Sequence, residues 1–251
     1  MSDKPKLIIA DPGLLGAART RRDVLKIMAM GGAVVFLPTV IAACSKDNSV
    51  TNPITPVTPG SGSALTIDFA KGDIAVLQFA YLLEQLEADF YTKVVANFGS
   101  SNLTAAEKTV LQDIKYHEVL HREFLKAAVG ASNGFSATPT YPGVTFTDRL
   151  SVLNTAKTFE DLGVAAYNGA AQYISSTDYL TLAGKIVSVE ARHAAAIRDL
   201  LNPKSGDFAP NTFDNVFKPA LVAASAQGYV VDKLGFANAP ATFIQGPNGN
   251  G

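Results

Sequence analysis

The chain is poor in cysteine, tryptophan and charge. Its 251 residues include one Cys, no Trp and three His, and only 17% of them are Asp, Glu, Lys or Arg. A single cysteine excludes an internal disulfide and any zinc or iron–sulfur site that needs several thiolates. The 21 basic residues nearly balance the 22 acidic ones, so charge gives no reason to expect nucleic acid as a partner.

A long apolar run is also missing. The most apolar stretch near the N-terminus, residues 27–43, is 17 residues long and contains two glycines and a proline, which is short for a membrane-spanning helix. Hydrophobic residues nevertheless make up 47% of the chain, too many for a wholly disordered protein. The length suits one folded domain with appendages better than two full domains.

The N-terminal region resembles a bacterial export signal. Residues 20–26 read TRRDVLK, and Arg21 and Arg22 resemble the twin-arginine motif. The apolar stretch that follows ends in VIAAC at residues 40–44, which resembles a lipobox, whose cysteine is acylated and becomes the new N-terminus. The order and spacing of the two motifs favour a signal peptide at 1–43 over an apolar helix with an incidental cysteine. We therefore expect an exported lipoprotein, periplasmic or on the outer surface, with the translocation machinery as a partner and Cys44 lipidated in the membrane.

The rest of the chain is predicted to be helical after a short tether. Residues 44–66 are rich in Ser, Thr, Pro and Asn, as in a flexible spacer. Apolar residues at i+3 and i+4 spacing predict helices over about 71–98, 104–129, 148–174 and 177–201, and TAAE at 104–107 is a capping box. The connection between the second and third helices is long, whereas the other two are short. This order predicts two antiparallel hairpins joined by a crossover, within a domain at 67–202.

The C-terminal region is predicted to cover this domain. Residues 203–245 contain Phe208, Phe213 and Phe217 and an apolar segment at 220–231. We expect this extension to fold back on the bundle as a short fifth helix. Residues 246–251, GPNGNG, are expected to be a disordered tail.

Each of the four predicted helices carries an acid on its apolar face. Glu-x-x-His occurs twice, at 118–121 and 190–193, and each is preceded by a Glu-x-Leu-x-x-x-x-Tyr segment, at 84–91 and 160–167. Residues three apart on a helix share a face, so each Glu and its His can bind one ion. An uncompensated buried carboxylate costs several kcal/mol, whereas four carboxylates around two divalent cations are neutral.

With these motifs, the region from about Asp68 to Leu201 resembles a ferritin-like domain. The resemblance implies an all-α fold, an antiparallel four-helix bundle that binds two iron or manganese ions through two single Glu residues and two Glu-x-x-His motifs. Exported ferritin-like proteins with a twin-arginine signal, some of them described as desiccation-related, are the most similar group. The matching positions are Glu84, Glu118, His121, Glu160, Glu190 and His193.

The sequence leaves several alternatives open. Glu87 also lies on an apolar face and is an alternative ligand to Glu84. His117 and Glu123 flank a motif and are expected in solvent or beside the ligands. Tyr91 and Tyr167 are candidates for hydrogen bonds to the ligands, or for plain core residues. The Glu and His pairs are also compatible with buried hydrogen-bonded pairs in a bundle without metal.

Two function classes follow from the resemblance. In the first, a binuclear iron or manganese centre reacts with a small oxidant, dioxygen or peroxide, in oxidative or desiccation stress protection or in ferrous iron oxidation. In the second, the protein is a non-catalytic, structural or stress-protective ferritin-like protein, with or without metal. Carboxylate and imidazole ligands suit both metals. A homo-oligomer is compatible with either class, but a lipid anchor on every subunit would constrain a closed iron-storage cage.

Overall fold

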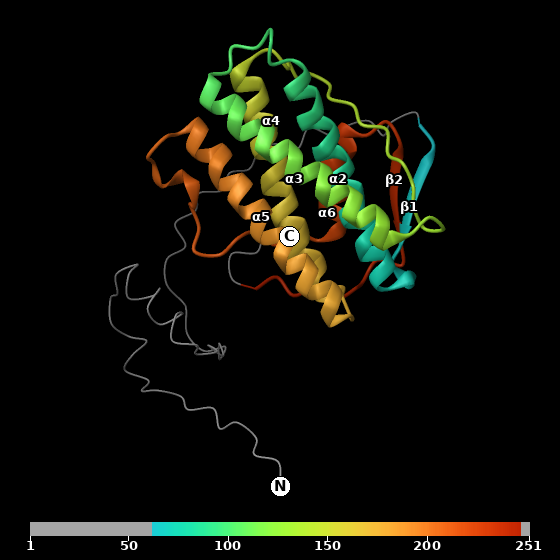
Figure 1. Ribbon diagram of the computed structural model, residues 1–251. Coiled ribbons are helices and arrows are strands. Elements are labelled where there is room, and N and C mark those ends of the chain that lie inside the picture. The colour runs from blue at the N-terminus through green and yellow to red at the C-terminus, as the bar shows by residue number, and fades with distance from the viewer. Residues whose placement is uncertain (1–61, 247–251) are drawn as a thin grey trace, which may run out of the picture. The chain divides into compact units, whose positions relative to one another are not determined.

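The computed structural model describes residues 62–246 (Figure 1). The motif at Arg21 and Arg22, the lipidation site at Cys44, most of the predicted tether and the tail from 247 on lie outside these residues. The described part is mostly helical. In chain order its α-helices and strands are β1 (Ala64–Asp68), α2 (Asp73–Ala96), α3 (Ala105–Val129), α4 (Arg149–Ala170), α5 (Thr177–Leu201), α6 (Pro219–Ala226) and β2 (Lys233–Ala237). None of the helices between 62 and 246 has both the length and the apolar composition to cross a membrane.

The long helices begin and end where local chemistry sets their limits. Thr104 and Glu107 form the expected capping box at the start of α3, and Gly130, with φ 74°, ends the helix. Asp148 and Ser176 cap α4 and α5 through their side chains. The first helix ends earlier than expected, at Ala96, since Asn97 caps its last turn, and the third gives way to a 3-10 turn at Ala171–Tyr173.

Four long helices pack as two pairs, α2 with α3 and α4 with α5. The long connection between α3 and α4 runs back over α2 (Figure 1). The Gln85 side chain accepts a hydrogen bond from the Ala137 N–H at 3.0 Å, and the Tyr141 hydroxyl donates to the Leu86 carbonyl at 2.8 Å. Helix α2 is therefore covered on most of its circumference, and most of its residues are buried.

Two apolar clusters occupy the space between the long helices. One contains Leu77 and Tyr81 from the start of α2, Leu125 from the end of α3 and Ile186 from the first half of α5. The other contains residues from the opposite ends of these helices, among them Leu111 and Ile197. The four acids singled out from the sequence lie between the two clusters along each helix. This arrangement requires α2 to run opposite to α3, and α4 opposite to α5.

The expectation of an all-α fold was wrong in one respect. β1 and β2 form a two-stranded parallel sheet, in a register that runs from Ala64 opposite Lys233 to Asp68 opposite Ala237. Residues 64–66 therefore belong to a strand and not to the tether. Both strands are five residues long and lie at opposite ends of the described chain, so no local pattern in the sequence reveals their pairing.

The C-terminal extension packs on α4 and on the long connection. The Phe217 N–H donates to the Ala165 carbonyl at 3.0 Å, and the Val231 N–H donates to the Thr138 carbonyl at 2.9 Å. Helix α6 is shorter than the predicted apolar segment, and its Val222 and Ala226 lie in a cluster with core residues of α2 and α4. Gly169 permits this approach, because a Cβ there would lie 1.9 Å from the Phe217 carbonyl oxygen.

Replacement of Gly169 by Ala is expected to destabilise the protein. The added methyl group meets backbone rather than a flexible side chain, and such overpacking costs about 1–3 kcal/mol. Gly184→Ala in α5 is the matched control, because a Cβ there has no neighbour within 4 Å and Ala is the better helix former by roughly 0.5–1 kcal/mol. Urea unfolding should show a lower midpoint for the first variant only. An unchanged midpoint for Gly169→Ala would contradict the packing of the extension on α4.

Candidate metal centre

Six side chains from the four long helices meet in the middle of the protein. They are the residues that the sequence singled out: Glu84 on α2, Glu118 and His121 on α3, Glu160 on α4, and Glu190 and His193 on α5. All four glutamates are 0% exposed, and His193 is buried. The two Glu-x-x-His motifs approach from different helix pairs, so the cluster forms only when the two pairs pack together.

The ligand atoms of these residues form two overlapping groups. Glu84 and His121 belong to the first, Glu160 and His193 belong to the second, and Glu118 and Glu190 belong to both. Within each group the donor atoms all lie within 4.8 Å of one another. Each group could hold a metal ion, and the two groups have Glu118 and Glu190 in common.

The histidines contact acids of the opposite helix pair. His121 Nδ1 on α3 lies 2.9 Å from a Glu190 oxygen on α5, and His193 Nδ1 on α5 lies 2.7 Å from a Glu118 oxygen on α3. Within each motif, the distance from Nδ1 to the preceding glutamate is longer, 3.4 Å for His121 and 3.8 Å for His193. Each Nδ1 therefore points at a group of oxygens rather than at one partner.

Within residues 62–246, eight buried atoms of this cluster lack a hydrogen-bond partner. They are both oxygens of Glu118 and Glu190, one oxygen each of Glu84 and Glu160, and Nδ1 of His121 and His193. The close nitrogen–oxygen pairs do not have hydrogen-bond geometry. An unsatisfied buried polar atom costs about 1–3 kcal/mol, so eight of them at one place require a compensating partner. Carboxylate oxygens and imidazole nitrogens are a donor set that fits divalent transition metals, and the chemistry of the residues present therefore fits bound metal.

Two tyrosines satisfy the remaining oxygens of the single glutamates. The Tyr167 hydroxyl on α4 donates to Glu84 Oε1 on α2 at 2.6 Å, and the Tyr91 hydroxyl on α2 donates to Glu160 Oε1 on α4. The sequence indicated that these tyrosines could reach the ligands. It did not show that each bonds the acid of the other half of the chain. The exchange leaves the second oxygen of each glutamate facing the centre.

The electrostatics of the cluster favour bound positive charge. Burial alone would lower the pKa of His121 and of His193, but the glutamates that face them raise both to about 12. Burial raises the pKa of Glu160 to about 7, and burial and the nearby Glu190 raise the pKa of Glu118 well above its usual range. Without metal, the acids must hold protons or pair with imidazolium; bound cations remove that requirement.

Glu87 lies beside the centre but in neither group of donors. Its side chain is 3% exposed, and burial and then Glu190 raise its pKa well above the usual range. A Cβ at Gly163 would lie 3.1 Å from a Glu87 oxygen and 3.8 Å from a Glu190 oxygen. Gly163 follows Glu160 by three residues, as Glu87 follows Glu84, so the second half of the chain leaves space for the extra acid of the first. The structure favours Glu84 over Glu87 as a member of the donor set.

His117 approaches the centre from outside. A hydrogen bond joins His117 Nδ1 on α3 to His193 Nε2 on α5 at 2.8 Å, and the two rings stack with centroids 5.1 Å apart. With Nε2 engaged, His193 presents Nδ1 to the glutamates. The sequence placed His117 in solvent or beside the ligands, and only helix packing shows which residue it contacts. Glu123 lies on the surface, where it pairs with Arg122 at 2.7 Å.

Comparison with known families agrees with this geometry. Residues 72–203, over half of the chain, match a family model described as ferritin-like domain. The chain belongs to the ferritin-like family. A search of curated proteins finds no significant match. All six clustered residues lie inside the ferritin-like domain, whose presence confirms the resemblance drawn from the sequence, while their role as metal ligands stays a prediction.

If the ferritin-like domain binds metal, chelation should lower its melting temperature. Binding to the folded state alone raises stability by about 4 kcal/mol when free metal exceeds the dissociation constant a thousandfold. Scanning calorimetry with ferrous or manganous ion, and then with chelator, measures the difference. The double variant Glu118→Gln with Glu190→Gln should lose most of it, because both groups of donors lose shared ligands. Glu123→Gln, on the surface, should behave like the wild type. Equal melting temperatures for chelated and metal-replete wild type would exclude a stabilising metal site.

Proposed function

We propose that this chain is a lipid-anchored protein of the bacterial cell envelope whose four long helices form an antiparallel ferritin-like bundle around two iron or manganese ions. The bound pair reacts with dioxygen or hydrogen peroxide, in protection against oxidative or desiccation stress or in oxidation of ferrous iron. One observation carries the proposal: eight buried donor atoms without hydrogen-bond partners, drawn from all four long helices in the described region, converge on one place.

The residues of the cluster would each contribute different ligand atoms to the two ions. Glu118 and Glu190 each offer two free oxygens and belong to both donor groups, so they would help to hold both ions. Glu84 and Glu160 each offer one oxygen, because a tyrosine hydroxyl binds the other. Nδ1 of His121 and of His193 completes one group each. The four carboxylates neutralise two divalent cations, which removes the cost of burying four like charges.

The surroundings would protect the reaction from water. When bound, two such ions supply one electron each, enough to reduce one dioxygen with two protons to hydrogen peroxide, or one hydrogen peroxide with two protons to two waters. The apolar clusters that contain Leu111 and Leu125 lie on either side of the donor layer. The tyrosines fix the orientation of Glu84 and Glu160, and the hydrogen bond between His117 and His193 fixes that of His193. These contacts hold the donors in place as the charge of the centre changes.

A metal-free structural protein is the second candidate. The observation in its favour is the short distance between each histidine and a glutamate, 2.7 Å for His193 with Glu118 and 2.9 Å for His121 with Glu190. Two imidazolium ions would offset two of the four carboxylates. The other two acids would then have to hold protons, and the misaligned donors would still lack hydrogen bonds. The redox metal centre accounts for more of the geometry.

Rapid mixing tests the reaction. The purified protein is loaded without oxygen with two ferrous or two manganous ions per chain and mixed with dioxygen or hydrogen peroxide. We expect oxidation faster than that of the same metal in buffer, because the donors hold both ions together. His121→Ala and His193→Ala should each abolish the difference, and Glu123→Ala should not. If two ions bind per chain but react no faster than free metal, the redox proposal is contradicted and the structural alternative is favoured.

The anchor is tested separately in cells. The motifs around Arg21, Arg22 and Cys44 support export and lipidation. With Cys44→Ala the protein should leave the membrane fraction, because the lipid would be its only attachment. Replacement of Arg21 and Arg22 by Lys is the matched control and should instead retain the precursor in the cytoplasm. Mass spectrometry of the mature N-terminus identifies the acylated residue. Undiminished membrane association of Cys44→Ala would contradict the lipoprotein assignment.

A further inference from the structure

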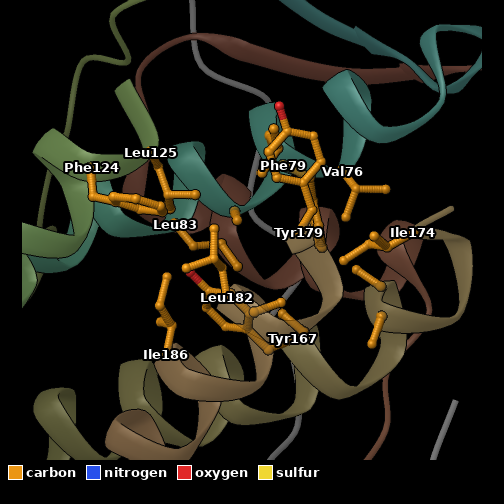
Figure 2. Close-up of a pocket in the computed structure, with 16 residues that line it drawn as sticks. Val76, Phe79, Leu83, Phe124, Leu125, Tyr167, Ile174, Tyr179, Leu182 and Ile186 are labelled. Carbon is orange, nitrogen blue, oxygen red and sulfur yellow. The ribbon is translucent and has the colours of Figure 1, made fainter. Parts of the chain in front are cut away.

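An apolar pocket lies between the four long helices, next to the candidate ligands. Its empty space, counted together with the open solvent at its mouth, is about 500 Å³, and hydrophobic or aromatic residues line it throughout. Leu83, Leu125 and Ile186 lie toward one side of the pocket, whereas Ile174 lies toward the other (Figure 2). Phe124, 42% exposed, also lines it, so the pocket reaches the surface beside α3.

The inner wall of the pocket is formed by neighbours of the ligands. Ala80, Leu125 and Ile186 line the pocket, and each is four residues from a candidate ligand: Glu84, His121 and Glu190 respectively. Four residues correspond to about 6 Å along a helix, so this wall lies one turn from the donor layer. Tyr167 joins the two directly, because it lines the pocket and donates its hydroxyl hydrogen to Glu84 at 2.6 Å.

The chemistry of the wall selects among small oxidants. Tyr167 and Tyr179 are the two lining residues with a polar side-chain group, and the Tyr167 hydroxyl is already committed to Glu84. Hydrogen peroxide donates and accepts hydrogen bonds in water, and a polar molecule that enters an apolar site without replacing those bonds binds unfavourably. A metal ion would lose far more hydration free energy than hydrogen peroxide on entering such a pocket. Dioxygen makes no such bonds with water and therefore loses none on entering an apolar site. Dry apolar cavities take up apolar ligands such as xenon and benzene for the same reason.

Resting on the proposed redox function, we propose that this pocket binds dioxygen and delivers it to the metal pair, and that hydrogen peroxide is not its ligand. Dioxygen is then the oxidant that reaches the metal site through this pocket. The wall of Ala80, Leu125 and Ile186 forms the inner end of the route, and Phe124 lies at its mouth.

Xenon tests the pocket without reference to metal. Xenon, like dioxygen, is a small apolar molecule that enters dry apolar cavities. Its binding to the metal-free full chain can be followed by ¹²⁹Xe NMR. Ala183 lines the pocket from α5 and is partly buried, so Ala183→Leu should fill it and weaken xenon binding by about tenfold, or about 1.4 kcal/mol. Ala127→Leu, on the exposed surface of α3, is the matched control and should bind like the wild type. Equal binding by all three proteins, or none by the wild type, would overturn the proposal.

The same variants, loaded with metal, test the choice of oxidant. Ala183→Leu should slow the reaction with dioxygen by about tenfold and leave the reaction with hydrogen peroxide unchanged, while Ala127→Leu changes neither rate. Equal slowing of both reactions would overturn the selectivity. An acyl chain or other organic molecule retained in native mass spectrometry would replace dioxygen as the occupant.

Failure of the redox function itself would look different. The wild type would then bind xenon but react with neither oxidant. Circular dichroism and melting temperature verify that the variants fold. If Ala183→Leu does not fold, Leu182→Phe fills the same pocket from the neighbouring position.

Discussion

Four carboxylates buried in the middle of the protein are the constraint on which the rest of the structure depends. Each is fully removed from water, and their mutual repulsion in a low-dielectric interior has to be offset by protons, imidazolium or metal ions. The long helices bring two histidines and two tyrosine hydroxyls to the acids and hold them between apolar clusters. A bundle that only needed a core would be more stable with leucine at these positions. The buried acids therefore support the proposed metal site.

The cluster is nearly symmetric, and its departures from symmetry distinguish the two groups of donors. Tyr91 and Tyr167 exchange partners between the halves, and each histidine faces the acid of the opposite helix pair. Glu87, however, occupies space opposite Gly163, and His117 contacts only one of the two histidines. The two groups of donors therefore have different surroundings. The apolar pocket adds a third difference, because Tyr167 joins it to the Glu84 side of the centre.

The parts outside the four helices hold α2 in place. The long connection bonds to α2 through Gln85 and Tyr141, and the C-terminal extension bonds in turn to that connection and to β1. Glu84 and Tyr91 both lie on α2, so the contacts that fix this helix also fix two side chains of the cluster.

The sequence by itself determined the long helices, the capping box at Thr104 and the six residues of the centre, because helical periodicity and i, i+3 spacing are local properties that side-chain type records directly. It also identified the ferritin-like family through the repeat of its motifs. Only the tertiary structure decided the exchange of tyrosines between halves, the contact of His117 with His193, the place of Glu87 against Gly163, the pairing of β1 with β2, and the apolar pocket. These features join residues far apart in the chain, and their geometry depends on how the helices pack, which no local pattern encodes.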